Sequence, residues 1–207
     1  MMLHGGVIAA MGTFFVFSDY MKPAVRLAAL MQVPVKFIWT HDAFRVGEDG
    51  PTHEPVEQEA QIRLMEKLQN HAGRDSVRVF RPADADETTE GNDYEQARKG
   101  AYIVAGSDEN PDVILVASGS EVSTLEAGCD ALRADGIKVR VVSAPSEGLF
   151  RRQSAEYQES VLPYDVKKFG MTAGLPCTLE GLVGIGPNSK IFGMKSFGFS
   201  APYKVLD

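Results

Sequence analysis

Cysteine and basic charge are both scarce in this sequence. Only Cys129 and Cys177 are cysteines among its 207 residues, which is too few for a disulfide framework and favours a reducing, cytoplasmic environment. Lysine and arginine number 21 against 28 aspartates and glutamates, so the net charge is −7 at pH 7. This acidic net charge argues against general nucleic-acid binding, although a local basic patch could still bind a phosphate.

Long apolar runs are also absent, and with them any predicted membrane span. Residues 1–17 are apolar, but they lack a basic start, and His4 with the following glycine pair interrupts them. The apolar run after His4 is shorter than the ~20 residues that a membrane-spanning helix needs. We expect a buried core segment here, and its abrupt start suggests that the chain begins inside a domain.

What is present is the composition and pattern of a globular α/β protein. Apolar residues make up 44% and charged residues 24%, and the length allows one large domain or two smaller ones. Pro23 is expected in the first turn of the first helix. In the first half we predict a helix over 17–31, a buried parallel strand over 35–40 and a polar loop over 41–55. A second helix over 56–71, a short strand over 77–80 and the acidic first turn of another helix at 84–87 follow.

A second series of strands and helices follows a polar, weakly periodic stretch at 88–99, which we predict to be a linker. Strands are expected over 113–117, 139–143, 168–173 and 190–197, and helices over 121–135, 146–160 and 201–207. Strands that alternate with helices imply parallel sheets with helices on their faces. The predicted fold class is therefore α/β, with two consecutive parallel-sheet domains.

The densest polar loop, residues 40–53, directly follows the predicted buried strand. Ligands of open parallel sheets bind beyond the carboxyl ends of the strands, and this loop contains His41 and His53 together with three acidic residues. A metal site would lack any familiar ligand spacing. Acid–base or substrate-binding histidines fit better, because imidazole titrates near neutral pH. A solvated loop that bonds only to itself is the third alternative.

Two further patterns could bind a ligand. Phe14, Phe17 and Tyr20 are spaced three residues apart, which groups them on one side of a helix; such a stripe is usually core and less often a ligand surface. The Ser-Gly-Ser turn at 118–120 could offer backbone N–H groups to an anion, but such turns also simply cap helices. Neither cysteine has the partner spacing of a catalytic nucleophile.

Five motifs together resemble the transketolase family. In chain order they are GTFFVFSDY at 12–20, THDAFRVGEDGPTHEPVEQ at 40–58, RPADADET at 81–88, ASGSEV at 117–122 and KSFGFSAPYKVL at 195–206. The resemblance runs nearly end to end, and its GEDGPTHEP stretch is specific. It implies the C-terminal half of a transketolase, with a partial pyrimidine-binding domain at 1–90, a linker at 91–110 and the C-terminal domain at 111–207.

The resemblance implies a transferase of the pentose phosphate pathway that uses thiamine diphosphate and Mg²⁺ to move a two-carbon ketol unit between phosphorylated sugars. It implies that Phe14, Phe17 and Tyr20 pack against the aminopyrimidine ring of the cofactor. His41 would contact oxygens of the donor sugar and Asp49 a substrate hydroxyl. His53 would bind the acceptor phosphate or pass a proton. The implied catalytic residues are thus His41 and His53, and no metal ligand is expected in this chain.

The sequence departs from the family pattern in three places. The glutamate that activates the cofactor would lie upstream of Met1, as would the whole pyrophosphate-binding domain with its Mg²⁺ ligands. A helix, a buried strand and a Ser-Arg-Gln turn are missing between Thr89 and Glu90, either by a true deletion or because the printed sequence omits them. A sheet that lacks this strand would expose apolar surface and unpaired backbone, which favours an omitted stretch over a true deletion. The chain also stops at Asp207, within a helix that the family completes.

The resemblance therefore leads us to expect a chain that is inactive alone and binds no cofactor by itself. Its expected partners are a second copy of itself, an N-terminal transketolase half and phosphorylated sugars, in the cytoplasm and without nucleic acid or membrane. The C-terminal domain would be mainly structural. One alternative is a non-catalytic dimerisation module, and another is part of a related thiamine enzyme such as deoxyxylulose-phosphate synthase. The intact His41, Asp49 and His53 argue against the non-catalytic module. The GEDGPTHEP stretch and the SAPYKVL ending favour transketolase over the related thiamine enzymes.

Overall fold

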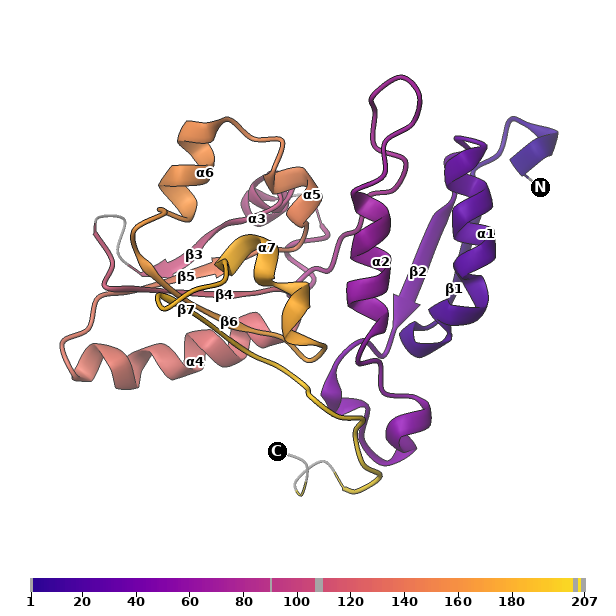
Figure 1. Cartoon of the computed structure of the whole chain (residues 1–207). Helices are drawn as coiled ribbons and strands as arrows, with labels where there is room; N and C mark the ends of the chain where they lie inside the picture. The colour runs from indigo at the N-terminus through magenta and orange to yellow at the C-terminus, as the bar shows by residue number, and fades with distance from the viewer. Residues whose placement is uncertain (1, 90, 107–109, 203–204, 206–207) are drawn as a thin grey trace. The chain divides into compact units, whose positions relative to one another are not determined.

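The computed structural model describes residues 2–89, 91–106, 110–202 and 205 of the chain (Figure 1). The chain forms two compact units, the first made of Met1–Val77 with Met194–Asp207 and the second of Arg78–Gly193. It therefore leaves the first unit once and returns to it at the end. Each unit has its own β-sheet. None of the described helices is both long enough and apolar enough to cross a membrane.

A two-stranded parallel sheet lies in the first unit. β1 (Ala10–Phe14) pairs with β2 (Lys36–Thr40), and the register sets Phe14 beside Thr40 at the carboxyl ends. The helix between the two strands makes a βαβ crossover, the connection that parallel strands need. The helical elements of this unit are η1 (Met2–His4), η2 (Phe15–Phe17), α1 (Ser18–Leu30), η3 (Phe44–Thr52) and α2 (Gln58–Glu66).

One side of β2 is packed and the other is open. Trp39 lies 5.5 Å from the Phe15 ring, measured between centroids, and its indole N–H donates to the sulfur of Met21 at 3.4 Å. Ile38, on the opposite side of the strand, is 55% exposed. The sequence predicted a strand buried on both sides. That prediction is wrong, because the two-stranded sheet leaves this face of β2 uncovered.

Two predictions for the N-terminal segment are also wrong. The described part of the segment 1–17 is not buried core. Ile8, before β1, and Met11, within it, are exposed, and β1 pairs with one strand among the described residues. Pro23 does not lie in the first turn of its helix, because α1 begins at Ser18 and follows η2 without a break. The helix thus accommodates a proline in its interior.

The segment from 78 to 89 contains neither the strand nor the helix that the sequence predicted. The Asp84 carboxylate accepts backbone N–H groups from Asp86 at 2.9 Å and Glu87 at 3.2 Å. A short aspartate side chain that takes these donors offers the backbone an alternative to a helix. The segment is instead held by single contacts to the rest of the second unit, among them the hydrogen bond from the backbone N–H of Arg81 to the Pro145 carbonyl oxygen at 2.9 Å.

The second unit has a five-stranded sheet in the order β3-β5-β4-β6-β7. Four strands run parallel, and β3 (Tyr102–Gly106) pairs antiparallel with β5. The parallel strands are β4 (Val113–Ala117), β5 (Val139–Ser143), β6 (Lys167–Met171) and β7 (Ser189–Phe192). The helical elements are α3 (Asn92–Ala97), α4 (Glu121–Ala134), α5 (Glu147–Phe150), α6 (Ala155–Val161), η4 (Pro176–Thr178) and α7 (Glu180–Val183).

Helices cover both faces of this sheet. Figure 1 shows α4 on one face and α5, α6 and α7 on the other. Each face has its own apolar core, one built around Val122, Leu125 and Cys129 of α4, and the other around Phe150 and Leu182 with their neighbours. The predicted α/β class with mainly parallel sheets is confirmed, and Cys129 is an inert part of the core.

Several details of the second unit differ from the sequence prediction. The antiparallel strand β3 was not predicted, and α3 lies in the polar stretch at 88–99. The single helix expected over 146–160 is split into α5 and α6, because the Ser154 side chain accepts the Tyr157 N–H at 3.2 Å and starts a new helix. Most of the helix expected at 201–207 lies outside the described residues.

Candidate functional site

The candidate residues of the first unit gather where its two parallel strands end. β1 ends at Phe14 and continues directly into η2 and α1, which carry Phe17 and Tyr20. β2 ends directly before His41, and the following loop with η3 leads to His53. Because parallel strands end at the same edge of a sheet, these two segments start side by side.

Phe14, Phe17 and Tyr20 form a continuous aromatic surface. The rings of Phe14 and Phe17 are stacked with centroids 6.1 Å apart, and Tyr20 lies 6.0 Å from Phe17. Tyr20 is 83% exposed, whereas the neighbouring Phe15 is buried against Trp39. Phe14 and Phe17 are half-buried. Of the two alternatives for this stripe, core or ligand surface, a stripe that is not enclosed fits the ligand surface better.

Both candidate histidines contact this aromatic surface. His41 stacks on Phe14 with centroids 3.7 Å apart and an interplanar angle of 20°. His53 stands edge-on to Phe17 at 5.4 Å and to Phe14 at 5.9 Å. The backbone of His41 has a φ of +55°, an uncommon conformation for a residue other than glycine. Together these five side chains, Phe14, Phe17, Tyr20, His41 and His53, are called the ring cluster below.

The threonine that precedes each histidine orients its ring. Thr40 Oγ1 lies 2.9 Å from Nδ1 of His41, and Thr52 Oγ1 lies 2.9 Å from Nδ1 of His53. The Thr52 hydroxyl donates its proton to the Asp49 carbonyl oxygen at 3.3 Å, so Thr52 Oγ1 accepts from the His53 Nδ1–H. This hydrogen-bond pattern assigns the Nδ1–H tautomer to a neutral His53 and leaves Nε2 as the acceptor.

Asp49 lies in the same loop and is exposed. The described contacts join its carbonyl oxygen, through Thr52, to His53. The structure thus brings Phe14, Phe17, Tyr20 and both histidines together, and it connects Asp49 to them through the main chain rather than through the carboxylate.

The sequence analysis missed the two threonines and Glu54. The repeated Thr-His pair at 40–41 and 52–53 was a signal for the threonines. Glu54 is 7% exposed, and its Oε1 has no hydrogen-bond partner among the described residues. Burial raises the pKa of its carboxyl group. Nothing in the sequence marks this burial, because the covering residues come from the far end of the chain.

The turn at 118–120 in the second unit does not provide an anion site. The Arg81 guanidinium donates to the Ser118 carbonyl at 2.7 Å and to the buried Glu121 carboxylate at 2.6 Å. A Cβ atom on Gly119 would lie only 2.6 Å from Arg81 Cζ, so the guanidinium fills the space over the turn. Across the described residues, no group of three or more His, Cys, Asp or Glu side chains could hold a metal ion.

Two family profiles match the sequence. The family described as "Transketolase, pyrimidine binding domain" matches residues 1–107, and "Transketolase-like TK C-terminal domain" matches residues 100–207. The chain is 42% identical to the transketolase of Halalkalibacterium halodurans over 235 aligned residues, which cover 98% of this chain and 33% of the relative. It is 41% identical to the Bacillus subtilis transketolase, over 100% of this chain and 34% of the relative.

Solved structures give the same result. Leishmania mexicana transketolase superposes with a TM-score of 0.85 at 35% identity, covering 99% of this chain and 32% of that one. A protein described as "Split gene transketolase, inactive beta4 tetramer" shares the fold, with a TM-score of 0.66 at 20% identity over 95% of this chain and 70% of that one.

Length distinguishes this chain from the relatives it matches. It spans about a third of the length of the curated transketolases. The alignment with the Halalkalibacterium protein has more positions than the 207 residues of this chain, so that relative carries residues without a counterpart here. The resemblance seen in the five motifs is confirmed, and the chain belongs to the transketolase family.

Proposed function

We propose that this chain is the pyrimidine-binding and C-terminal portion of a thiamine-diphosphate-dependent transketolase, which transfers a two-carbon ketol unit between phosphorylated sugars. The observation that carries this proposal is the ring cluster, in which a partly exposed aromatic surface and two oriented imidazoles meet at the carboxyl edge of a parallel sheet. A merely structural remnant of the family would not need exposed rings at this place.

The aromatic surface fits the cofactor of the family. Flat aminopyrimidine rings bind by stacking and by burial of apolar area, and Phe14, Phe17 and Tyr20 offer aromatic faces and edges for both. When bound, thiamine diphosphate supplies a carbon nucleophile and an electron sink for the two-carbon unit. Among the described residues of this chain, no group of three or more His, Cys, Asp or Glu side chains is placed to hold a divalent cation. We therefore assign the pyrophosphate group and Mg²⁺ to the N-terminal half of a complete transketolase.

The two histidines and Asp49 act on the sugars. With Nδ1 held by a threonine hydroxyl, each imidazole presents Nε2 to a substrate oxygen. His41, stacked on Phe14, binds the oxygens of the donor sugar, and His53 accepts a proton or binds the phosphate of the acceptor. Asp49, exposed in the same loop, accepts a hydrogen bond from a sugar hydroxyl.

The proposed assembly contains an N-terminal half and a second copy of this chain. The relatives are about three times as long as this chain, and the structural neighbour described as a split-gene transketolase is a precedent for a divided enzyme. We place the assembly in the cytoplasm and in the pentose phosphate pathway. In this proposal the isolated chain is inactive and does not retain the cofactor.

Isothermal titration with thiamine diphosphate and Mg²⁺ tests the proposal. We expect no binding at micromolar cofactor by this chain alone, and binding when the N-terminal half of the Bacillus subtilis relative is added. Phe17→Ala should abolish the binding in that mixture, whereas Phe192→Ala, an exposed phenylalanine of the second unit, should not. Micromolar binding by the isolated chain, or an unaffected Phe17→Ala mixture, would contradict the proposal.

A further inference from the structure

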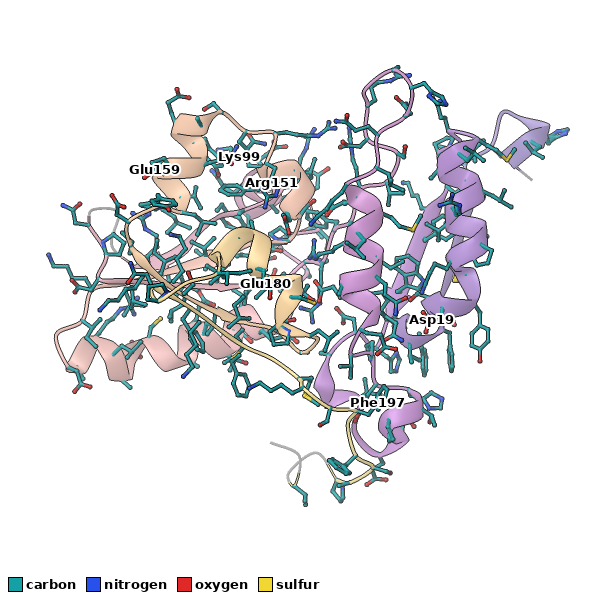
Figure 2. All side chains as sticks on the ribbon, in the orientation of Figure 1. Asp19, Lys99, Arg151, Glu159, Glu180 and Phe197 are labelled. Atoms are coloured by element: carbon teal, nitrogen blue, oxygen red, sulfur yellow. The ribbon has the colours of Figure 1, made fainter. Side chains whose placement is uncertain are left out.

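The C-terminal end of the first unit crosses the loop that carries His53. Residues 194–200, called the strap below, belong to the first unit although they follow the second unit in the sequence. The hydroxyl of Ser200 donates to the carbonyl oxygen of Glu48 in η3 at 2.7 Å. Figure 2 shows the labelled Phe197 next to this loop. The strap thus reaches the loop from a distant part of the chain.

Gly50 couples the strap to His53. Its carbonyl oxygen accepts the backbone N–H of His53 at 3.0 Å and that of Glu54 at 3.1 Å. Its φ is +71°, and a Cβ atom there would lie 2.9 Å from the Cβ of Ser200. Any other residue at position 50 would therefore be strained in its backbone and would also push against the strap. The turn that sets the position of His53 therefore packs against the strap at a position where only glycine fits without strain.

Glu54 makes the second contact between the loop and the strap. Its carboxyl group packs directly against Gly198, where a side chain of any size would collide with Glu54 Oε2. The carboxyl group is buried there, and its Oε1 has no hydrogen-bond partner in the described part of the chain. A buried polar group without a partner is costly, so a role beyond stability would explain its presence.

We propose that the strap and Glu54 position His53: Gly198 and Ser200 clamp the 48–54 turn, and this clamp holds the His53 imidazole against Phe17. Glu54 and the strap act as positioning residues, because they contact the turn and not the ring cluster. The inference rests on the proposed function for its catalytic meaning. The effect of the clamp on the position of the His53 imidazole can be measured without cofactor or substrate.

Proton NMR of the histidine rings in the full chain measures this position. The sequence has four histidines, so four imidazole Hε1 signals are expected. The signal that His53→Gln removes is that of His53. The edge-on contact with Phe17 at 5.4 Å places the His53 protons where the aromatic ring current displaces their resonances. We expect Gly198→Ala to move the His53 signals toward their position in the urea-unfolded chain. The His71 signals should stay unchanged.

Matched variants separate positioning from stability. Gly128→Ala adds the same methyl group where nothing lies within 4 Å, and it should leave His53 in place. Ser200→Ala removes the bond to Glu48 without adding an atom, and it should move the His53 signals even if Gly198→Ala does not fold. Glu54→Gln keeps the shape of the side chain and should leave the signals in place, whereas Glu54→Ala should move them.

Unchanged His53 signals in folded Ser200→Ala and Glu54→Ala would overturn the clamp. A merely structural strap would give this result, with lower melting temperatures and an unmoved imidazole. Cofactor titrations decide the proposed function separately, so the two proposals can fail independently of each other.

Discussion

His41 and His53 each follow a threonine, and in both cases the threonine hydroxyl meets Nδ1. The same dipeptide thus repeats both the residue and its orientation, and in each ring the threonine meets Nδ1 rather than Nε2. An orienting partner that fixes the tautomer and direction of an imidazole is a common requirement of acid–base and hydrogen-bond catalysis. The threonines belong to the site as much as the histidines do.

His41→Ala should slow the assembled enzyme without weakening cofactor binding. A hydrogen bond that strengthens as charge develops acts on the rate, and one such donor is typically worth about 2–4 kcal/mol. We expect turnover of the donor sugar to fall by more than about tenfold, in steady-state assays of this chain mixed with an N-terminal half. His71→Ala, outside the ring cluster, is the matched control. Parallel losses in cofactor affinity and turnover would place His41 in the wrong role.

Glu54 predicts a pH dependence of stability. Burial raises the pKa of its carboxyl group in the folded chain, so folding disfavours the ionised form. The contribution of the neutral carboxyl group to the free energy of unfolding is fully present below the ordinary glutamate pKa of about 4.3. This contribution is lost as pH rises through the raised pKa of the folded chain. Glu54→Gln, which cannot ionise, should therefore raise the free energy of unfolding at pH 7.

Urea denaturation between pH 4 and pH 8 measures the Glu54 effect. The advantage of Glu54→Gln over the parent chain should shrink toward the acidic end. Glu48→Gln, an exposed glutamate in the same loop, should show no comparable trend. A Glu54→Gln chain that is less stable than the parent at pH 7 would mean that the carboxylate is stabilised in a way that its burial does not suggest.

At the scale of single residues, the sequence predicted that Phe14, Phe17 and Tyr20 lie together, but it could not show how the ring cluster is held. Their spacing predicted one side of a helix. The three rings are neighbours, but Phe14 ends β1 and Phe17 lies in η2, so one helix does not carry all of them. The burial of Glu54 depends on Gly198, which lies 144 positions further along the chain. No local pattern carries such information, because periodicity reports only neighbours within one element.

Among the structural elements, the segment 78–89 covers the carboxyl ends of the strands in the sheet of the second unit. In open α/β sheets, ligands bind beyond the carboxyl ends of the strands. Here Arg81 lies over the turn that follows β4. The carboxylate of Glu87, 1% exposed, accepts hydroxyl hydrogen bonds from Ser143, at the end of β5, and from Tyr102. The segment therefore occupies the edge of the second sheet.

Arg81→Met should destabilise the chain strongly. It removes the cation from the buried Glu121, 2% exposed, and breaking one partner of a buried ion pair typically costs about 3–5 kcal/mol. Adding Glu121→Met should restore much of the stability, because a well-packed apolar pair avoids the uncompensated charge. Chemical denaturation of the two variants provides the comparison.

A surface ion pair serves as the control for Arg81. Arg98 pairs with Glu95 at 3.4 Å, with both side chains mostly exposed, and Arg98→Met should cost less than about 1 kcal/mol. Equal losses for Arg81→Met and Arg98→Met would show that Arg81 does not anchor the segment.

The elements that sequence reasoning missed share a cause. The strand expected at 77–80 and the helix expected at 84–87 had suitable residues. Hydrogen bonds to the Asp84 carboxylate and contacts with the rest of the second unit determine the conformation of this segment instead. β3 was missed because an antiparallel strand breaks the alternation of strand and helix on which the prediction relied. The strongly apolar strands β4 and β5 were predicted with their observed bounds, since burial on both faces leaves a clear sequence pattern.

On the scale of the whole molecule, the two units differ in how completely their sheets are covered. The second unit encloses the central strands of its sheet between two apolar cores. The sheet of the first unit has two strands in the part of the chain that the structure describes, and Ile8, Leu30 and Ile38 are exposed. The small sheet thus leaves part of its apolar surface uncovered.

This uncovered surface predicts that the chain self-associates. Each strand of the two-stranded sheet has one outer edge whose backbone N–H and C=O groups have no strand partner among the described residues, and such edges template pairing with another chain. Apolar patches of more than a few hundred Å² are rare on monomers without a binding role. A closed two-fold dimer is the commonest outcome of such association. Light scattering should therefore show a mass that rises toward a dimer with increasing concentration.

A pair of substitutions tests whether the first unit carries the association. Ile38→Thr, on the open face of β2, should shift the monomer–dimer transition to higher concentration by several-fold while keeping the melting temperature, because threonine retains the β-branched shape of the strand residue. Ile185→Thr makes the same change at a residue of the second unit that is 84% exposed and should leave the transition where it is. A strictly monomeric mass at tens of micromolar would show that the uncovered face of β2 and its free edges do not pair, and that an N-terminal half would have to supply the contacts that close the enzyme.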